Sequence, residues 1–276
     1  MILSVIIVNY HNPALLKLAL SSLARVWSFQ DTGEVIVIDS ESSHETQATA
    51  QSGLAQFRHS LYVPYKENTG YTRGVNEGLR KANGQYLLIL NPDIVLQEGT
   101  IEHLVATLEQ DPTIGLLGPK LLNMDGTRQD SCFRFYRVST VIARRIGGLR
   151  REEDRFLMRD VDLSEQTDVD WLMGSALMTT RTALQRVGLM DESFFLYYSE
   201  VDWAYRFWEN EYRVVYAPSV SLYHYHQRES SGYGPILDLL LRRQARWHLS
   251  DGIRFFSKHG ISPTRSSTQR ITPTQS

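Results

Sequence analysis

The sequence contains only one cysteine, Cys132, so no intrachain disulfide can form and nothing in it indicates an oxidising compartment. It has no uninterrupted apolar run that approaches the about 18 residues of a membrane-spanning helix. The first residues lack the basic segment of a secretory signal, and they are predicted to form a strand instead. These absences together favour a protein of the cytoplasm.

An excess of charge of one sign is also missing. The formal net charge is −2, which disfavours a general nucleic-acid binder because such proteins are usually basic. No Gly-x-Gly-x-x-Gly follows the first predicted strand, so a nicotinamide-dependent oxidoreductase is disfavoured as well. The remaining composition, 42% hydrophobic and 22% charged over 276 residues, is typical of a soluble globular protein with one large or two small domains.

One short apolar run is the most informative stretch of the chain. Tyr86–Leu90 follows Gly84 and stops at Asn91-Pro92-Asp93, which is typical of a strand buried on both faces. Pro92 cannot donate to a sheet ladder, so the strand must end there and leave Asp93 at its carboxyl edge. Ligands of open α/β sheets bind outside these edges. A carboxylate at that place is suited to hold a hard cation, and the cation to hold a diphosphate.

Strand-like and helix-like segments alternate through the first half of the chain. Strands are predicted at Ser4–Val8, Val35–Ile38, Leu61–Val63 and Tyr86–Leu90, and helices after Asn12-Pro13, at His44–Phe57, after the turn 68–76 and at Thr100–Gln110. This alternation implies an α/β fold with a mostly parallel, right-handed βαβ sheet. The second half is predicted to add strands at Ile114–Leu122, Asp170–Thr180, Val214–Ala217 and Val220–Tyr225, helices at Thr182–Val187 and Glu200–Glu211, and a hairpin turn at Asp125-Gly126.

Two stretches leave alternatives open. Residues 138–168 are rich in arginine and acidic side chains, which indicates either a mobile loop over an acceptor site or a solvated face. From Pro235 to His259 the sequence predicts a basic helix rich in Trp, Phe and Leu. Such a helix either packs on the domain with its apolar face or lies in a membrane interface. Residues 262–276 are polar and predicted to be disordered.

Two groups of polar residues fall at the predicted ends of strands 35–38 and 61–63. Asp39 follows the first of these strands, where a carboxylate can accept a hydrogen bond from a base imide or a ribose hydroxyl. The turn after the second contains four further candidates: Asn68, Gly70, Gly74 and Asn76. Because this turn leads into a helix, its N–H groups favour a diphosphate, although such glycines often mark mere turns.

Acidic residues and histidines form two further candidate groups. Glu200 and Asp202 lie two apart at a predicted helix start, after the aromatic run Phe194–Tyr198. Residues two apart do not share a helix face, so at most one is expected to point into an active site while the other caps or pairs. Both histidines of Tyr223–His226 would share one face of a strand, where a neutral imidazole could join Asp93 on a metal.

Taken in order, these segments resemble the inverting family 2 glycosyltransferases with a GT-A fold. The matching segments span residues 2–226 and are Ser4–Tyr10, Val37–Ser40, Asn68–Asn76, Leu88–Asp93, Trp171–Ser175, Phe194–Asp202 and Tyr223-His224. Asn91-Pro92-Asp93, the Asp170–Ser175 segment and the tail Arg246–His248 are most similar to bacterial rhamnosyltransferases of cell-wall and O-antigen assembly. The resemblance implies a GT-A domain over residues 1–226, with a nucleotide-sugar half up to about residue 112 and an acceptor half from 113, followed by a helical extension and polar tail over 227–276.

The resemblance also implies roles for individual residues. The nucleotide-diphosphate sugar would contact ten residues: Asn9, Tyr10, Asp39, Asn68, Gly70, Arg73, Gly74, Asn76, Asn91 and Asp93. Asp93 and His224 would hold Mg²⁺ or Mn²⁺ on the diphosphate. Glu200 would be the general base, with Asp202 as a plausible substitute. The acceptor would be bordered by three residues: Trp171, Gly174 and Tyr198.

Two positions depart from the family pattern. Asn91 stands at the first position of the family's Asp-x-Asp motif, so metal binding is expected to be weaker than in a two-carboxylate site. Ser199-Glu200 replaces the usual Glu-Asp pair, so the base would be one methylene longer.

The function implied is an inverting, metal-assisted transfer of a sugar, best L-rhamnose from dTDP-rhamnose, to a hydroxyl of a glycan or lipid-linked saccharide. Peripheral contact of the basic helix with the inner membrane leaflet would fit such an acceptor. The alternatives are a family 2 transferase that uses a UDP-sugar, and a catalytically silent relative that only binds nucleotide-sugar or glycan.

Overall fold

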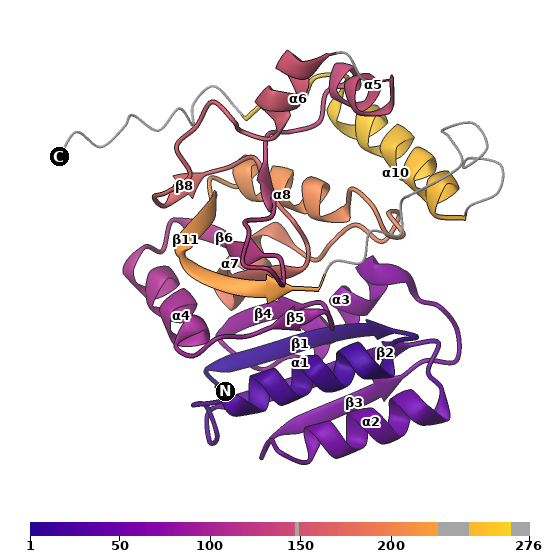
Figure 1. Cartoon of the computed structure of the whole chain (residues 1–276), viewed down its shortest axis with the longest axis vertical. Helices are drawn as coiled ribbons and strands as arrows, with labels where there is room; N and C mark the ends of the chain where they lie inside the picture. The colour runs from indigo at the N-terminus through magenta and orange to yellow at the C-terminus, as the bar shows by residue number, and fades with distance from the viewer. Residues whose placement is uncertain (147–148, 226–242, 266–276) are drawn as a thin grey trace.

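The computed structural model describes residues 1–146, 149–225 and 243–265. In this part of the chain, nine strands form one mixed sheet in the order β3-β2-β1-β4-β10-β6-β11-β5, with β8 paired to β11 (Figure 1). These strands are β1 Leu3–Tyr10, β2 Gly33–Ser40, β3 Ser60–Pro64, β4 Tyr86–Leu90, β5 Ile94–Val95, β6 Ile114–Leu122, β8 Thr167–Asp168, β10 Ala176–Thr180 and β11 Arg213–His224. A separate pair joins β7 (Cys132–Phe133) to β9 (Trp171–Leu172).

The strands β1 to β4 are parallel, as the alternation of segments predicts. Their apolar sequences suit this position, because β2 and β4 are buried along their whole length. Strand β10 lies antiparallel between β4 and β6, and β11 runs parallel to β6. The carboxyl ends of β1, β2 and β4 therefore meet at one edge of the sheet, which is the usual ligand-binding edge of an open α/β sheet.

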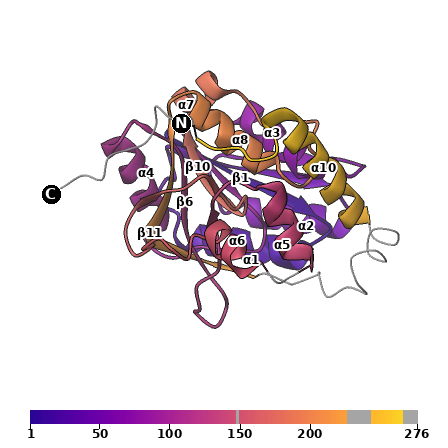
Figure 2. The same ribbon diagram turned by 90° about the horizontal axis from the view of Figure 1, so that it is seen from above.

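Helices cover both faces of the sheet (Figures 1 and 2). On one face lie α1 (Pro13–Arg25), α2 (His44–Leu54) and α4 (Thr100–Gln110), and on the other α3 (Gly70–Lys81), α7 (Arg181–Val187) and α8 (Ser199–Glu209). Alternate side chains of β1 serve the two cores: Val5 and Ile7 join the first, and Ile6 and Val8 the second. Side chains of β1 therefore pack against the helices on both faces of the sheet.

The charge-rich stretch 138–168 is not an irregular loop. It contains α5 (Val138–Ile146) and α6 (Arg150–Phe156), and the ring of Phe156 stacks on Phe133 with centroids 5.2 Å apart. These helices are short and rich in charged residues, which hides their periodicity in the sequence. Two strand predictions are also wrong. Asp170–Thr180 is divided into β9 and β10 by the turn 173–175, whereas 214–217 and 220–224 belong to the single strand β11, which ends before Tyr225.

Helix α10 (Arg243–His259) packs on the domain, which supports the packed alternative for this part of the predicted basic helix. Trp247 contacts Phe195 with ring centroids 4.5 Å apart, and Phe255 contacts Tyr198 at 5.3 Å. The predicted helix start at Pro235 lies outside the described residues. Among the described helices, none is both long and apolar enough to cross a membrane.

Candidate active site

The carboxyl ends of β1 and β2 bring Asn9 and Asp39 side by side. Asp39 is fully buried, and its two carboxylate oxygens accept hydrogen bonds of 2.7 Å from Asn9 Nδ2 and from the Tyr62 hydroxyl. Burial, together with the Asp39 carboxylate, raises the pKa of Tyr62 to about 12, so this hydroxyl stays protonated and keeps donating. Within the described chain, the buried Oδ1 of Asn9 has no hydrogen-bond partner. Tyr10 is half exposed at the same edge.

The connection between β3 and α3 carries further predicted donor residues. Asn68 Oδ1 accepts a hydrogen bond from the Gly70 N–H at 2.8 Å. Gly70 has a φ of +74°, which favours glycine, and a Cβ there would lie 2.7 Å from the Phe195 carbonyl oxygen. The turn therefore touches the segment that precedes α8.

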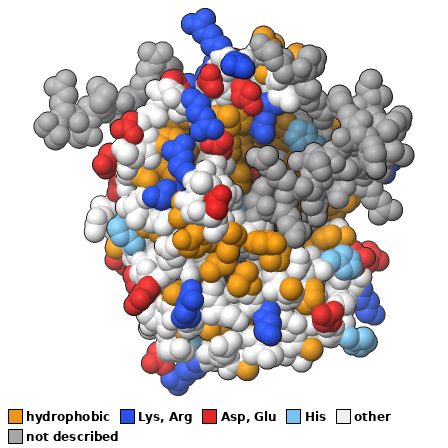
Figure 3. All heavy atoms as spheres, viewed as in Figure 1, with side chains coloured by type: hydrophobic (Ala, Val, Ile, Leu, Met, Phe, Trp, Pro, Cys, Tyr) orange, Lys and Arg blue, Asp and Glu red, His pale blue; other side chains and the backbone are white. Residues whose placement is uncertain are grey.

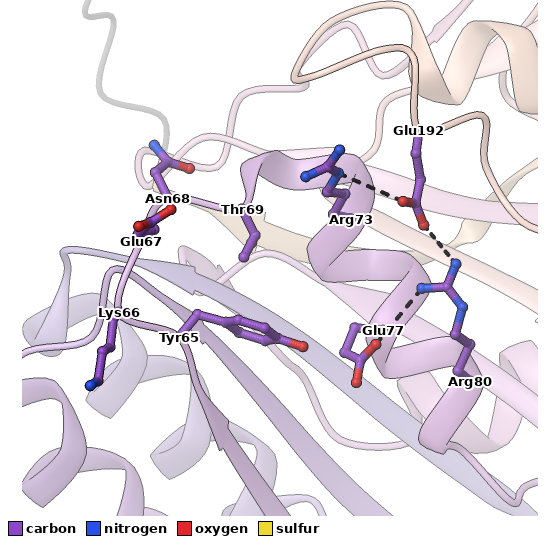
Figure 4. A pocket seen from close by; sticks show the side chains of 9 residues that line it. All are labelled: Tyr65, Lys66, Glu67, Asn68, Thr69, Arg73, Glu77, Arg80 and Glu192. Atoms are coloured by element: carbon purple, nitrogen blue, oxygen red, sulfur yellow. Dashed lines mark hydrogen bonds and ion pairs between the residues drawn. The ribbon is translucent and has the colours of Figure 1, made fainter.

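A cavity of about 460 Å³ lies beside this turn (Figure 4). Asn68 and Arg73 line it, and Glu192 pairs with Arg73, with its carboxylate 3.6 Å from Arg73 Nε. Its volume is that of a small-molecule site. The residues at the ends of β1, β2 and β4 do not line it, so the predicted donor residues fall into two groups.

Two predicted donor residues have structural roles. A Cβ on Gly74 would lie 2.6 Å from Val8 Cγ1, so this glycine lets α3 approach β1 closely. Asn76 is fully buried, and its amide donates to the Met190 carbonyl at 2.8 Å and accepts from the Met190 N–H at 2.9 Å. Both residues fix α3 against its neighbours, and we do not include them in the donor site.

Asp93 and His224 meet at the edge of the sheet. Nε2 of His224 lies 3.2 Å from Asp93 Oδ2 and 3.2 Å from Ser175 Oγ, and its Nδ1 lies 2.8 Å from Gln129 Oε1. Gln129 Nε2 donates to the His224 carbonyl and to Asn123 Oδ1, which leaves Oε1 as the acceptor for the ring. A neutral His224 ring therefore carries its proton on Nδ1 and turns the Nε2 lone pair toward the Asp93 carboxylate.

This arrangement fits a divalent cation. A carboxylate oxygen and a nitrogen lone pair that face each other need a proton or a cation between them, and an oxygen behind the other ring nitrogen is usual for a histidine that binds metal. Asp93 Oδ1 is also buried without a partner in the described chain. Across residues 1–146, 149–225 and 243–265, no three His, Cys, Asp or Glu side chains form a metal-binding group. A cation at this pair would take further oxygen ligands from diphosphate and water, as Mg²⁺ commonly does.

The turn Gly174-Ser175 connects this pair with Glu200. Ser175 contacts His224, and the adjacent Gly174 carbonyl accepts a hydrogen bond of 2.7 Å from the Tyr71 hydroxyl. Burial raises the pKa of Tyr71, and the negative charge of Glu200 raises it further. The turn therefore touches His224 through Ser175 and, through Gly174, a hydroxyl on which the charge of Glu200 acts.

Glu200 has the properties of a general base. It lies partly exposed in the first turn of α8, and Ser199 Oγ donates to its Oε2 at 3.2 Å. Burial raises the pKa of Glu200 to about 7, hydrogen bonds from its own backbone and Ser199 oppose the shift, and the charge of Asp251 adds to it. A base works best when its pKa lies near the ambient pH.

Asp202 does not fit the role of a substitute base. It is fully buried, with Lys258 Nζ at 2.6 Å, His259 Nε2 at 2.8 Å and Arg206 Nε at 3.0 Å. Although burial raises the pKa of Asp202, hydrogen bonds from His259 and Lys258 hold it below the usual value. The expectation that only one of the two acids points into the site agrees with this geometry, and Asp202 is the one that pairs.

Replacing Asp202 with alanine is expected to destabilise the fold by about 3 kcal/mol, because it removes a fully buried counter-charge from Arg206 and Lys258. Urea unfolding of the purified variant measures this loss. Glu209→Ala on the exposed side of α8 is the matched control and should change stability by less than about 0.5 kcal/mol. Equal stability of the Asp202 and Glu209 variants would contradict the assignment.

Trp171 and Tyr198, both predicted at the acceptor, belong to a cluster of stacked rings. Trp171 stacks on Phe133 with centroids 4.4 Å apart, and Tyr136 lies 5.5 Å from Trp171 and 5.0 Å from Tyr198. Trp171 and Tyr198 are nearly fully buried. Burial raises the pKa of Tyr136 to about 12; the charge of Arg144 opposes this shift and that of Glu200 adds to it. Trp171 and Tyr198 therefore support the wall of the site from behind.

Some residues of this site were not predicted from the sequence. They are Tyr62, Tyr71, Gln129, Ser175 and Asp251. Tyr71 and Ser175 fall inside segments that carry the family resemblance, so their polar atoms could have been considered there. Gln129 and Asp251 give no signal in the sequence, because each reaches the site only through the folded chain.

Comparison with known proteins decides the family. The sequence model of the family described as Glycosyl transferase family 2 matches residues 4–172, which is more than half of the chain. The chain belongs to this glycosyltransferase family. Asp39 and Asp93 of this glycosyltransferase lie inside the matched range, whereas Glu200, His224 and α10 lie beyond it.

Two relatives and one solved structure illustrate the similarity. "Low-salt glycan biosynthesis hexosyltransferase Agl10" of Haloferax volcanii is 26% identical over 215 residues, which cover 74% of this chain but only 61% of that protein. "N-acetylglucosaminyl-diphospho-decaprenol L-rhamnosyltransferase" of Mycobacterium tuberculosis is 26% identical over 267 residues, 89% of this chain and 83% of that protein. The mannosyltransferase PcManGT from Pyrobaculum calidifontis, in complex with GDP-Man and Mn²⁺, superposes with a TM-score of 0.59 at 19% identity over 91% of this chain and 64% of that one. The predicted α/β fold of the GT-A type, with helices around a central sheet and a helical C-terminal region, is confirmed.

Proposed function

We propose that this family 2 glycosyltransferase moves a sugar from a nucleotide-diphosphate donor to an acceptor hydroxyl, with inversion at the anomeric carbon. The observation that carries the proposal is the meeting of two functions at the turn Gly174-Ser175. A pair suited to a cation, Asp93 and His224, contacts Ser175, and the charge of Glu200, a carboxylate with a pKa of about 7, acts on the Tyr71 hydroxyl that is bonded to Gly174. One base and one displacement give inversion.

Each residue has a task in this proposal. Asn9 and Asp39 offer acceptors for the nucleotide at the ends of β1 and β2. Asp93 and His224 would hold Mg²⁺ or Mn²⁺, which when bound would offset the growing negative charge of the leaving diphosphate. Glu200 takes the proton of the acceptor hydroxyl as it attacks, a form of assistance that contributes typically about 10²–10⁴-fold. The structure of PcManGT is a complex with GDP-Man and Mn²⁺, which supports a divalent cation here.

The finer proposal is rhamnosyl transfer from dTDP-rhamnose to a lipid-linked saccharide. It is supported by the similarity along 89% of this chain to a protein named as a decaprenol-linked rhamnosyltransferase. A thermal-shift panel of dTDP-, UDP- and GDP-sugars with and without Mn²⁺ tests it. Selective stabilisation by dTDP-rhamnose is the expected result, whereas preference for a UDP-sugar would favour the alternative donor. Donor binding without transfer to any lipid-linked acceptor would favour a catalytically silent relative.

The pH dependence of kcat follows from Glu200. A protonated carboxyl cannot accept the hydroxyl proton, so kcat should fall tenfold for each pH unit below about 7 and level off above it. The contribution of Glu200 to folding stability should change with pH in the opposite direction, falling as kcat rises. The pKa of Glu200 is raised from 4.5, so the native state binds this proton more tightly than the unfolded chain. Its contribution to stability is therefore lost as pH rises from about 4.5 to 7. A kcat profile that is flat between pH 5.5 and 8 would contradict the role of Glu200.

A lipid-linked acceptor would bring the enzyme to a membrane surface, and one end of the molecule suits this. Helices α5, α6 and α10 gather there (Figures 1 and 2), and four large apolar side chains on or next to them are 40% to 58% exposed. They are Ile142, Leu149, Leu249 and Ile253. Arginine side chains accompany them, and Figure 3 shows Lys and Arg side chains gathered over this end. We propose that this end contacts anionic lipid, which attracts about 1 kcal/mol per basic residue near the surface.

Sedimentation with anionic phospholipid vesicles tests this contact. The double variant Leu249→Ser and Ile253→Ser should lose about tenfold in affinity or more, because each side chain forfeits about 1 kcal/mol or more of apolar burial. Leu61→Ser, at the opposite end of the molecule on β3, is 40% exposed and serves as the control. Equal vesicle binding by all three proteins would refute membrane contact at this end.

A further inference from the structure

Helix α10 reaches the segment that precedes Glu200 through one side chain, Asp251. This residue is fully buried. Its Oδ2 accepts hydrogen bonds from three successive backbone N–H groups, at 3.3 Å from Phe195, 3.3 Å from Leu196 and 3.1 Å from Tyr197. Hydrogen bonds to an ionised acceptor are stronger than neutral ones. A single carboxylate therefore gathers the N–H groups of this segment and fixes its conformation.

The gathered segment leads directly into the helix that carries the base. Tyr198 follows it with a φ of +63° and is the N-cap of α8, and Glu200 lies in the first turn. Rings of α10 hold the same segment, since Trp247 contacts Phe195 and Phe255 contacts Tyr198. The path of residues 195–198 therefore decides where the Glu200 carboxylate lies relative to the turn at Gly174.

We infer that Asp251 is a positioning residue for Glu200, so that α10 is part of the active site although it lies beyond the residues matched by the family model. This inference rests on the proposed function, in which Glu200 is the base. A base displaced by about 1 Å can lose on the order of 10²-fold in rate. Asp251 would thus act on the reaction without touching the substrate.

The charge of Asp251 has a second consequence. It adds to burial in raising the pKa of Glu200. Other titratable or charged groups lie on the elements packed here. The charge of Glu200 acts on Tyr71 of α3 and on Tyr136 before α5, and Arg144 of α5 also acts on Tyr136. On α10, the ring of His248 lies against Tyr198, and Arg254 Nη1 lies 3.8 Å from Asp251 Oδ1. Among these, Asp251 is the one that both fixes the segment 195–197 and raises the pKa of the base. Charge and geometry can be separated by substitution.

The test compares Asp251→Ala, Asp251→Asn, Glu200→Gln and the control Ser257→Ala, an exposed position on α10. Asp251→Ala removes the acceptor, so kcat should fall about 10- to 100-fold. The KM for the donor should change less than kcat, because Asp251 reaches the donor turn only through Phe195, whose carbonyl lies against Gly70. Asp251→Asn keeps an acceptor oxygen without the charge, so the loss in kcat should be smaller. The fall of kcat at low pH should then move to lower pH, because the pKa of Glu200 decreases.

Hydrogen exchange gives a readout that does not depend on activity. Asp251→Ala should speed exchange of the amides of residues 195–197, whereas Ser257→Ala should leave exchange and kcat as in the unchanged protein. If both Asp251 variants lose stability but keep kcat per folded molecule and the pH profile, Asp251 is merely structural and the inference is overturned. If Asp251→Ala does not fold, the pH profile of Asp251→Asn decides. Activity retained in Glu200→Gln would instead refute the proposed function.

Discussion

Glutamine in place of Glu200 is expected to lower kcat by about 10²–10⁴-fold, the contribution of general-base assistance. An amide has nearly the shape of the carboxyl group but cannot take the proton of an acceptor hydroxyl. In the proposed function Glu200 acts on the acceptor and not on the donor, so the Kd for the nucleotide-sugar should stay within about twofold. Steady-state kinetics at pH 8, where the carboxylate is ionised, and calorimetric titration with the donor measure the two effects.

The buried acid two residues later provides the comparison. Asp202→Asn alters a carboxylate that is held by Arg206, Lys258 and His259, so it should lower stability and leave the pH dependence of kcat unchanged. Glu200→Gln is therefore expected to change kcat, whereas Asp202→Asn is expected to change stability. If Glu200→Gln kept kcat within tenfold of the unchanged protein, another group would have to accept the proton, and Asp202 has no open path to do so.

The fold was largely predictable because its first half follows simple patterns. Buried strands such as Val35–Ile38 and Tyr86–Leu90 have uninterrupted apolar sequences, and the helices between them begin with clear signals, as at Asn12-Pro13. The second half was harder. The short helices α5 and α6 are rich in charged residues, and the long strand β11 contains Pro218 and two register shifts against β6, so neither shows a clean period.

The site was predictable where residues follow a strand end, and not where they arrive from elsewhere. Asp39 and Asp93 could be placed because a parallel strand presents the residue after it to the ligand edge. Asn76 lies in a motif whose spacing suggests a donor contact, yet its amide is used to hold Met190. Gln129 lies 95 residues from His224 in the sequence, and no local sequence pattern indicates that its side-chain amide orients the His224 ring.

Replacing Asp93 with asparagine should remove the metal dependence of the reaction. The variant keeps the shape of the side chain but loses the charge that faces His224 Nε2. Changes in partners behind a metal ligand typically cost about 10–100-fold in affinity or activity, so loss of the ligand itself should cost more. Titration of activity with Mn²⁺ measures the apparent Kd for the metal, and Asp125→Asn on the exposed hairpin is the matched control.

Chelation shows whether Asp93 acts through the cation. If it does, removing divalent metal should lower the unchanged protein to the activity of Asp93→Asn and should leave Asp93→Asn where it is, because both changes remove the same interaction. If chelation lowered the activity of Asp93→Asn by the same factor as that of the unchanged protein, Asp93 and the metal would act independently. This result would refute the site at Asp93 and His224. The activity of Gln129→Ala should lie between that of the unchanged protein and that of Asp93→Asn, with its metal affinity lowered by about 10–100-fold. Excess Mn²⁺ should restore Gln129→Ala, since it keeps both ligands, and should not restore Asp93→Asn.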